Sequence, residues 1–137
     1  MAGLASAGKY EYFCSCGASV SRTFAFTAKD TDLNSSPTIL VFGDMGKHGG
    51  APSLGRMTAE VDEGRGNITS VLHAGDFAYD LQDWGGANGD EFMRRIENIS
   101  GFVPYATTVG NHEIQSDRSF AHYRNRFSMP GNLNASA

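Results

Sequence analysis

The sequence lacks the features that mark membrane proteins and nucleic-acid-binding proteins. Its 137 residues contain no apolar stretch close to the roughly 20 residues that a membrane-spanning helix needs. Positive charge is also scarce, because 11 Lys and Arg face 15 Asp and Glu, and the basic side chains form no cluster. We therefore expect neither a membrane nor a nucleic acid among the partners of this chain.

Cysteine is nearly absent. The chain has two cysteines, Cys14 and Cys16, and one intervening residue leaves them too close for a comfortable mutual disulfide. No second cysteine pair or histidine cluster lies near them in the sequence, so a zinc site is not predicted. Each thiol could stay free or pair with a partner outside this chain, and the cysteines do not identify a compartment.

The signals for a cellular compartment are mixed. The N-terminus lacks the basic and apolar segments of a signal peptide. Four N-x-[ST] sequons nevertheless favour a secreted or lysosomal/vacuolar glycoprotein that has lost its true N-terminus, with unused loop triplets as the alternative. The sequons begin at Asn34, Asn67, Asn98 and Asn134.

The composition is that of a globular protein, with 40% hydrophobic and 11% aromatic residues, enough for one ordinary domain. Aromatic and polar residues alternate over residues 9–27 around a small, turn-like segment, which predicts a β-hairpin. Polar residues 31–37 predict a linker. We therefore expect a terminal hairpin within residues 1–30 and a separate unit over residues 38–137.

Residues 38–137 predict an α/β fold with the order β-α-β-α-β. Apolar runs at 38–42, 69–74 and 105–109 indicate strands, the first of them buried on both faces. Helical spacing indicates one helix from Ser53 to Glu63 and another that begins at Asp90, with Ser53 and Asp90 as N-caps. Residues 85–89 read as a glycine-rich loop before the second helix.

Each predicted strand is followed by glycine and then by an oxygen-bearing side chain, namely Asp44, Asp76 and Asn111. Open α/β sheets bind ligands beyond the carboxyl ends of their strands, so these side chains converge if the three strands are neighbours in one parallel sheet. Oxygen donors suit hard cations, and two cations about 3.5–4 Å apart can clamp a phosphoryl group. The pattern therefore predicts a metal site for phosphate chemistry.

Simpler interpretations exist for each motif taken alone. A Gly-Asp pair after a strand is usually an ordinary turn, and a lone His112 would be a surface loop histidine. A nucleotide-binding phosphate loop is excluded, because only two residues separate Gly43 from Gly46 and His48 follows Lys47. The three motifs together are what favour the metal site.

The segments GDMG at 43–46, GDFAY at 75–79 and GNHE at 110–113 resemble the first three of the five motifs of purple acid phosphatases, which belong to the calcineurin-like metallophosphoesterase superfamily. The resemblance covers nearly the whole chain. It implies a partial metallophosphoesterase sheet sandwich, preceded by the closing strands of a fibronectin III-like domain at 9–27. It also implies an acid phosphatase that hydrolyses phosphate monoesters.

Two positions discriminate within this superfamily. Most of its phosphoesterases carry Asp-x-His in the first motif, and that histidine binds a metal, whereas this chain has Gly46 there. Tyr79, three residues after Asp76, supplies a phenolate that suits Fe(III). The loss of one ligand and the gain of the other agree with the purple type of site.

The resemblance further implies a role for each matching residue. Asp44 and Tyr79 would bind the ferric ion, and Asp76 would bridge it to a divalent Fe, Zn or Mn ion. Asn111 would bind that divalent ion, while His112 would contact the phosphate of the substrate. In the family mechanism a metal-bound hydroxide attacks phosphorus.

The last two motifs of the family, V-x-x-H and G-H-x-H, are absent from this sequence. Its four histidines are His48, His73, His112 and His122, and we expect His73 to be a core residue or to lie behind the metal ligands. We therefore expect a truncated catalytic domain that binds metal weakly and is inactive alone.

Two alternatives remain: a metallophosphoesterase without the purple iron site, such as a diesterase, or a secreted protein that binds a partner without catalysis. The oligomeric state is open, with a homodimer of the full-length protein as one option.

Overall fold

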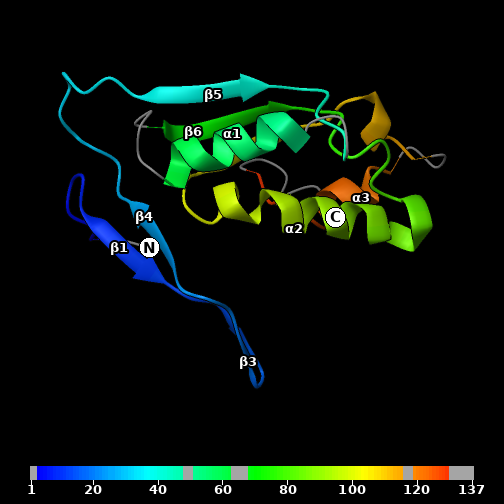
Figure 1. Ribbon diagram of the computed structural model, residues 1–137, viewed down its shortest axis with the longest axis horizontal. Helices are drawn as coiled ribbons and strands as arrows, with labels where there is room; N and C mark the ends of the chain where they lie inside the picture. Colours follow the sequence, from blue (N-terminus) through cyan, green and yellow to red (C-terminus); the bar gives the residue numbers. More distant parts are fainter. Residues whose placement is uncertain (1–2, 48–50, 63–67, 116–118, 130–137) are drawn as a thin grey trace.

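The computed structural model describes residues 3–47, 51–62, 68–115 and 119–129 (Figure 1). Its larger part is built on three parallel strands, β5 (Thr38–Phe42), β6 (Ile68–Ala74) and β7 (Tyr105–Thr108), with β6 in the middle. Helix α1 (Ala51–Asp62) follows β5 in the sequence, and α2 (Ala87–Ser100) follows β6. The predicted β-α-β-α-β order in one parallel sheet is confirmed.

The helices cover one face of this sheet (Figure 1). On β5, Leu40 and Phe42 are partly buried, whereas Ile39 and Val41 are 52% and 66% exposed. The prediction that this strand is buried on both faces is therefore wrong, because among the described residues nothing packs on the far face. The second sheet of a sandwich is likewise not found within the described ranges.

The core lies between the sheet and the helices. Its fully buried side chains include Phe77 and Leu81 from the loop after β6, and Phe92 and Ile96 from α2. The short helix α3 (Ala121–Arg124) and the residues after it add Tyr123 and Phe127, whose rings lie 5.9 and 4.8 Å from that of Phe77. The loop that follows β6 is thus held in place by the packing of Phe77 against Tyr123 and Phe127.

The helix starts differ from the sequence prediction. Helix α2 begins at Ala87, directly after the 3-10 turn η1 (Asp83–Gly86), so residues 85–89 are not an open loop. Gly86, with φ of 95°, occupies the N-cap, while Asp90 lies in the first turn and pairs with Arg126 at 2.6 Å. Ser53 is likewise no cap, because α1 begins two residues earlier. Glycine at the turn, rather than a capping oxygen, starts α2.

The predicted N-terminal hairpin is confirmed. Strands β1 (Lys9–Tyr12) and β4 (Phe24–Thr27) pair in antiparallel fashion, and β2 (Ser15–Cys16) and β3 (Ser19–Val20) extend the hairpin. The Tyr12 hydroxyl donates to the carbonyl of Gly101 at 2.9 Å, which attaches the hairpin to the end of α2. Both cysteines are exposed free thiols. The origin of the hairpin in a fibronectin III-like domain stays a prediction.

Two of the four sequons can be placed. Asn34 and Asn98 have exposed side chains, while Asn67 and Asn134 lie outside the described residues. None of the described helices is both long and apolar enough to cross a membrane.

Candidate metal centre

The carboxyl ends of the three parallel strands bring the predicted polar residues to one edge of the sheet. Asp44 follows β5, Asp76 follows β6, and Asn111 begins the 3-10 turn η2 (Asn111–Glu113) that follows β7. The backbone N–H of Asp44 donates to the carbonyl of Gly75 at 3.2 Å, so the pairing of β5 with β6 continues beyond the strands. The convergence that the sequence predicted therefore rests on neighbouring strands.

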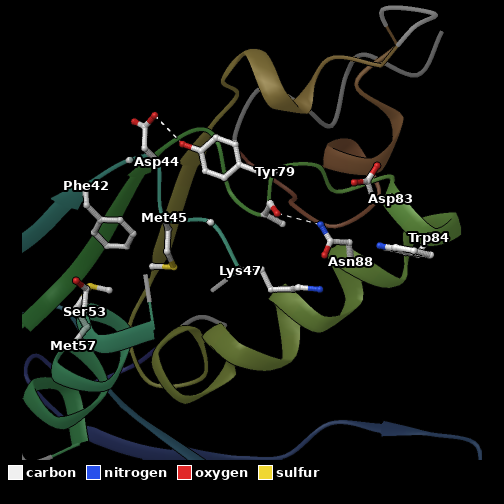
Figure 2. Close-up of a pocket in the computed structure, with 13 residues that line it drawn as sticks. Phe42, Asp44, Met45, Lys47, Ser53, Met57, Tyr79, Asp83, Trp84 and Asn88 are labelled. Atoms are coloured by element: carbon white, nitrogen blue, oxygen red, sulfur yellow. Dashed lines mark hydrogen bonds between the residues drawn. The ribbon is translucent and has the colours of Figure 1, made fainter. Parts of the chain in front are cut away.

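A pocket of about 780 Å³ opens at this edge (Figure 2). One end is formed by the loop after β5, including Asp44 and Lys47, and by Tyr79 from the loop after β6. Helix α1 contributes Ser53 and Met57, and the opposite rim is formed by Asp83, Trp84 and Asn88. This volume lies within the usual range for small-molecule sites.

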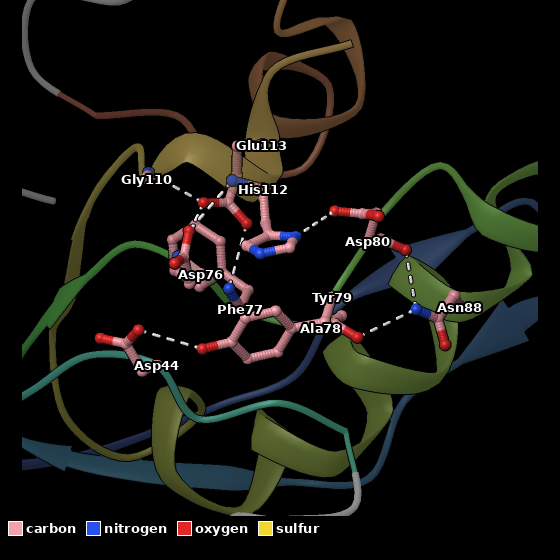
Figure 3. Close-up of polar contacts among 10 residues, drawn as sticks. All are labelled: Asp44, Asp76, Phe77, Ala78, Tyr79, Asp80, Asn88, Gly110, His112 and Glu113. Atoms are coloured by element: carbon pink, nitrogen blue, oxygen red, sulfur yellow. Dashed lines mark hydrogen bonds and ion pairs between the residues drawn. The ribbon is translucent and has the colours of Figure 1, made fainter.

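Tyr79 and Asp44 contact each other at one end of the pocket (Figure 3). The Tyr79 hydroxyl donates to Asp44 Oδ1 at 3.0 Å, so two oxygen atoms from different strand ends converge. Gly46 leaves room for this arrangement, because a Cβ there would approach Tyr79 Cδ2 to 3.1 Å. A larger side chain at position 46 and the Tyr79 ring compete for the same space, which explains why Gly46 accompanies Tyr79.

The backbone at three candidate ligands is left-handed. Asp44, Asp76 and Tyr79 have φ values of 52°, 55° and 44°, a region that residues other than glycine occupy infrequently. Such conformations persist only where surrounding contacts impose them, and they concentrate at functional sites. The three side chains thus leave the strand ends in directions that an ordinary extended backbone would not give.

A buried carboxylate joins the loops after β6 and β7. Glu113 is 1% exposed, and its Oε2 accepts the backbone N–H groups of Asp76 at 2.7 Å and of Gly110 at 2.8 Å. Its Oε1 accepts the N–H of Phe77 at 3.0 Å. Hydrogen bonds to an ionised acceptor are stronger than neutral ones. Glu113 therefore fixes the backbone of Asp76 against the turn that carries Asn111 and His112.

The Asp76 side chain makes a further contact with that turn. Its Oδ1 accepts the backbone N–H of His112 at 3.0 Å. A Cβ on Gly110 would overlap this same carboxylate, so glycine is required where β7 ends. Asp76 is therefore positioned through both its main chain and its side chain.

His112 is paired with Asp80, which the sequence interpretation did not identify. The His112 Nδ1 lies 2.7 Å from Asp80 Oδ1, and the imidazole ring stands edge-on to the Tyr79 ring at 4.4 Å between centroids. The hydrogen bond to Asp80 raises the pKa of His112. The imidazole is thus held beside Tyr79 and is more readily protonated than a free histidine.

His73 lies outside this cluster, as a core residue. Its ring is fully buried between Phe42 and Phe77, at 4.6 and 4.4 Å between centroids, and its Nδ1 lies 2.8 Å from the Tyr105 hydroxyl. Burial lowers the pKa of His73 to about 4. One of the two expectations for this histidine, a place in the core, is confirmed.

Two features of the site have signals in the sequence that were overlooked. Glu113 is the fourth residue of a G-x-x-E turn, a pattern in which glutamate reaches back to the first backbone N–H of a helical turn. Asn88 is 5% exposed and donates to the carbonyls of Ala78 and Asp80, at 3.1 and 2.7 Å. Its only signal is a polar residue on the apolar side of α2.

The remaining predicted residues contribute less to the geometry. Asn111 is exposed at the start of η2. Lys47 lines the pocket, as expected of a residue at the rim, but its Nζ pairs with Glu91 at 3.0 Å. His48 lies outside the described residues, and His122 lies in α3, where it contacts Arg126.

The donor atoms at this edge of the sheet can be compared with those that a metal ion requires. Among the described residues, no group of three or more His, Cys, Asp and Glu is arranged to hold a metal. Asp44, Asp76 and Tyr79 nevertheless present oxygen donors at adjacent strand ends, which is the donor chemistry of hard cations. Partial desolvation and the hydrogen bond to Asp44 raise the pKa of Tyr79, so a metal ion must displace its proton. These three residues therefore fit part of the ligand set of a metal site.

A family model and several curated proteins match most of this chain. The calcineurin-like phosphoesterase family model matches residues 37–136. The chain is 44% identical to acid phosphatase type 7 of Danio rerio over 128 residues, which is 93% of this chain and 28% of that protein. It is 41% identical to acid phosphatase type 7 of Homo sapiens over 125 residues, which is 90% of this chain and 27% of that protein. The chain thus spans little more than a quarter of these curated relatives.

A solved structure is similar in fold. The purple acid phosphatase PPD1 from yellow lupin (Lupinus luteus) seeds superimposes with a TM-score of 0.67 at 24% sequence identity, over 81% of this chain and 23% of that one. This likeness concerns the fold alone.

Proposed function

The chain belongs to the calcineurin-like phosphoesterase family, and on that basis we propose that it carries the oxygen-donor side of an acid phosphatase site. The proposed reaction is the hydrolysis of phosphate monoesters at a centre of Fe(III) and a divalent Fe, Zn or Mn ion. The similarity to acid phosphatases type 7 supports this assignment.

The contact between Tyr79 and Asp44 is the observation that carries the proposal. A phenol and a carboxylate 3.0 Å apart at a strand end form a pair of hard, potentially anionic donors, which is the chemistry that Fe(III) prefers. We therefore assign Asp44 and Tyr79 to the ferric ion. Asp76, on the neighbouring strand end, is assigned as the bridging carboxylate, and Asn111 as the amide ligand of the divalent ion.

When bound, two such ions would supply positive charge to the phosphoryl oxygens and activate a water molecule. The chain's own residues then orient and move protons. Glu113 holds the backbone of Asp76, so the bridging carboxylate keeps its position. Asp80 Oδ1 accepts a hydrogen bond from His112 Nδ1–H, which favours an imidazolium that can bind the anionic substrate.

Protonation of Tyr79 adds a condition. The raised pKa keeps Tyr79 a neutral phenol, and binding to iron as a phenolate would require the loss of that proton. The four proposed ligands are all oxygen donors, and we expect the isolated chain to bind metal weakly and to hydrolyse esters slowly. Rapid hydrolysis of a phosphate monoester by this chain alone would contradict that expectation.

The proposal is tested by adding Fe(III) to the chain and recording its visible absorption. A phenolate bound to iron gives a charge-transfer band, and we expect Tyr79→Phe to eliminate it. Tyr10→Phe is the matched control, because Tyr10 lies in the hairpin and stacks on Phe26. Equilibrium dialysis measures how much iron is bound. The assignment would be contradicted if the wild type binds iron but gives no band, or if the band survives Tyr79→Phe.

A further inference from the structure

Trp84 stands on the rim of the pocket with its side chain almost entirely in solvent. It is the single tryptophan of the chain, it is 86% exposed, and it lines the same pocket as Asp44 and Tyr79 (Figure 2). Within the described part of the chain, no other aromatic ring stacks on it. Such an uncovered indole beside a polar site leaves a ring face on which a bound ligand can stack, and its burial by a ligand would be favourable.

The backbone presents this indole on a fixed support. Trp84 has φ of 56° and is followed by Gly85 and Gly86, with φ of 66° and 95°. The carbonyl of Gly86 accepts a hydrogen bond from Arg126 Nη2 at 2.9 Å, which ties the turn to the residues that follow α3. The turn that carries Trp84 is therefore held on its C-terminal side by Arg126.

The same support is joined to the loop that carries Tyr79. Buried Asn88, in the first turn of α2, donates to the carbonyls of Ala78 and Asp80, the two neighbours of Tyr79. The position of the Trp84 turn and that of Tyr79 are thus coupled through one side chain. A ligand anchored at Tyr79 would meet Trp84 in a defined place.

The charges around the rim restrict what that ligand can be. Lys47 is the single Lys or Arg among the described residues that line the pocket, and Glu91 already neutralises it at 3.0 Å. Asp83 adds a carboxylate beside Trp84. A second phosphate group would meet no free positive charge here, whereas an uncharged planar ring would meet the face of an indole.

We propose that Trp84 determines specificity by stacking on the aromatic leaving group of a phosphate monoester whose phosphate lies at the Asp44–Tyr79 end of the pocket. The proposal rests on the proposed function, since it needs the phosphate to bind there. The leaving group carries a planar ring, as does the nucleoside released from a nucleoside monophosphate or the phenol released from a phosphorylated phenol.

Equilibrium binding tests this proposal without requiring turnover. In the presence of Zn²⁺, the chain is titrated with phenyl phosphate, adenosine monophosphate and glycerol 2-phosphate, and affinities are measured by calorimetry. Because Trp84 is the sole tryptophan, its fluorescence reports directly on the stacking. We expect at least one aromatic ester to change the emission and to bind about 3- to 10-fold more tightly than glycerol 2-phosphate.

Variants locate the preference. Trp84→Leu should bring the ratio of aromatic to aliphatic affinity close to one, and Trp84→Phe should keep most of it. Leu33→Ala is the control, because Leu33 is fully exposed in the linker and should leave the ratio as in the wild type. Circular dichroism verifies that the variants are folded.

The outcomes distinguish a failure of the role of Trp84 from a failure of the phosphate site. If adenosine monophosphate binds more tightly than phenyl phosphate, the ring is a nucleobase, and the reverse order indicates a phosphorylated phenol. Equal binding of aromatic and aliphatic esters, with unchanged emission, overturns the role of Trp84 and leaves the phosphate site intact. If no ester binds at a Zn²⁺ concentration that saturates the chain, the proposed phosphate site fails and the role of Trp84 fails with it.

Discussion

Two charged side chains join segments that are far apart in the sequence, one at the candidate site and one on the hairpin. Glu113 accepts three backbone N–H groups and is 1% exposed. Arg22 donates to Glu97 and Asn98 on α2, at 3.0 and 2.7 Å, but its side chain is 47% exposed. The contacts are similar in number, yet water can replace only those of Arg22. Burial, rather than the number of contacts, should decide what each is worth.

Replacing Glu113 with alanine should have the largest effect. Three backbone N–H groups would lose their acceptor at once, and each unsatisfied buried donor costs about 1–3 kcal/mol. We expect the free energy of unfolding to fall by at least about 3 kcal/mol, measured by urea denaturation. Glu97→Ala, on the exposed side of α2, is the matched control and should cost less than about 1 kcal/mol.

An equal loss in the two glutamate variants would remove the distinction between buried and exposed contacts. Glu113→Gln sharpens the test, because the amide keeps one acceptor oxygen in nearly the same volume. Its free energy of unfolding should lie between that of the wild type and that of Glu113→Ala.

Buried His73 should make the sheet sensitive to acid. Its pKa is about 4 in the folded chain and 6.5 in the unfolded one, so between these values the unfolded chain binds more protons. Stability should therefore be unaffected by this group above pH 6.5 and should fall as the pH drops toward 4. The full loss is about 3 kcal/mol.

The pH dependence of urea denaturation checks this, with the double variant His73→Phe/Tyr105→Phe as the comparison. Tyr105 is included because its hydroxyl would otherwise lose His73 as a partner. The variant should lack the part of the acid loss that belongs to His73. Identical pH profiles of the wild type and the variant would show that carboxylates alone cause the loss.

Tyr79→Phe should separate stability from metal binding. The hydroxyl that contacts Asp44 belongs to a residue that is 40% exposed, so its removal should lower the free energy of metal-free unfolding far less than Glu113→Ala does. Fe(III) should raise the melting temperature of the wild type, since a ligand of the native state stabilises it, and should raise that of the variant less. An equal rise in both proteins would argue against Tyr79 as a ligand.

The fold and the meeting of the strand ends could be predicted because their signals are local. Gly-Asp or Gly-Asn after each apolar run identified Asp44, Asp76 and Asn111, and the parallel order of the strands then placed them at one edge. Their roles as ligands stay predictions. The support for the site was harder to predict, because Glu113 and Asp80 act on residues that are 32–37 positions away.

Exposure could not be predicted for a different reason. The apolar run of β5 suggested burial on both faces, but the described helices cover only one, so Val41 and Ile39 remain exposed. An apolar run indicates that its residues are suited to burial. It does not indicate which elements are present to cover them. Trp84 is a similar case, because the two glycines after it indicate a turn but not whether another element covers its side chain.

Arg22→Ala should have the smallest effect and gives the other limit of the comparison. The ion pair with Glu97 is exposed at both partners, and such pairs contribute about 0.2–1 kcal/mol. The guanidinium also lies over the rings of Phe24 and Phe102, at 4.8 and 5.7 Å, which adds a contact that salt does not screen as strongly. We expect urea denaturation to show a loss of about 1 kcal/mol at low salt and a smaller loss at high salt.

Arg22→Lys keeps the charge but loses the planar group, so it should recover only part of that loss. A loss as large as that of Glu113→Ala would mean that the hairpin is an integral part of the folded unit, and that solvent exposure is a poor guide to the value of its contacts.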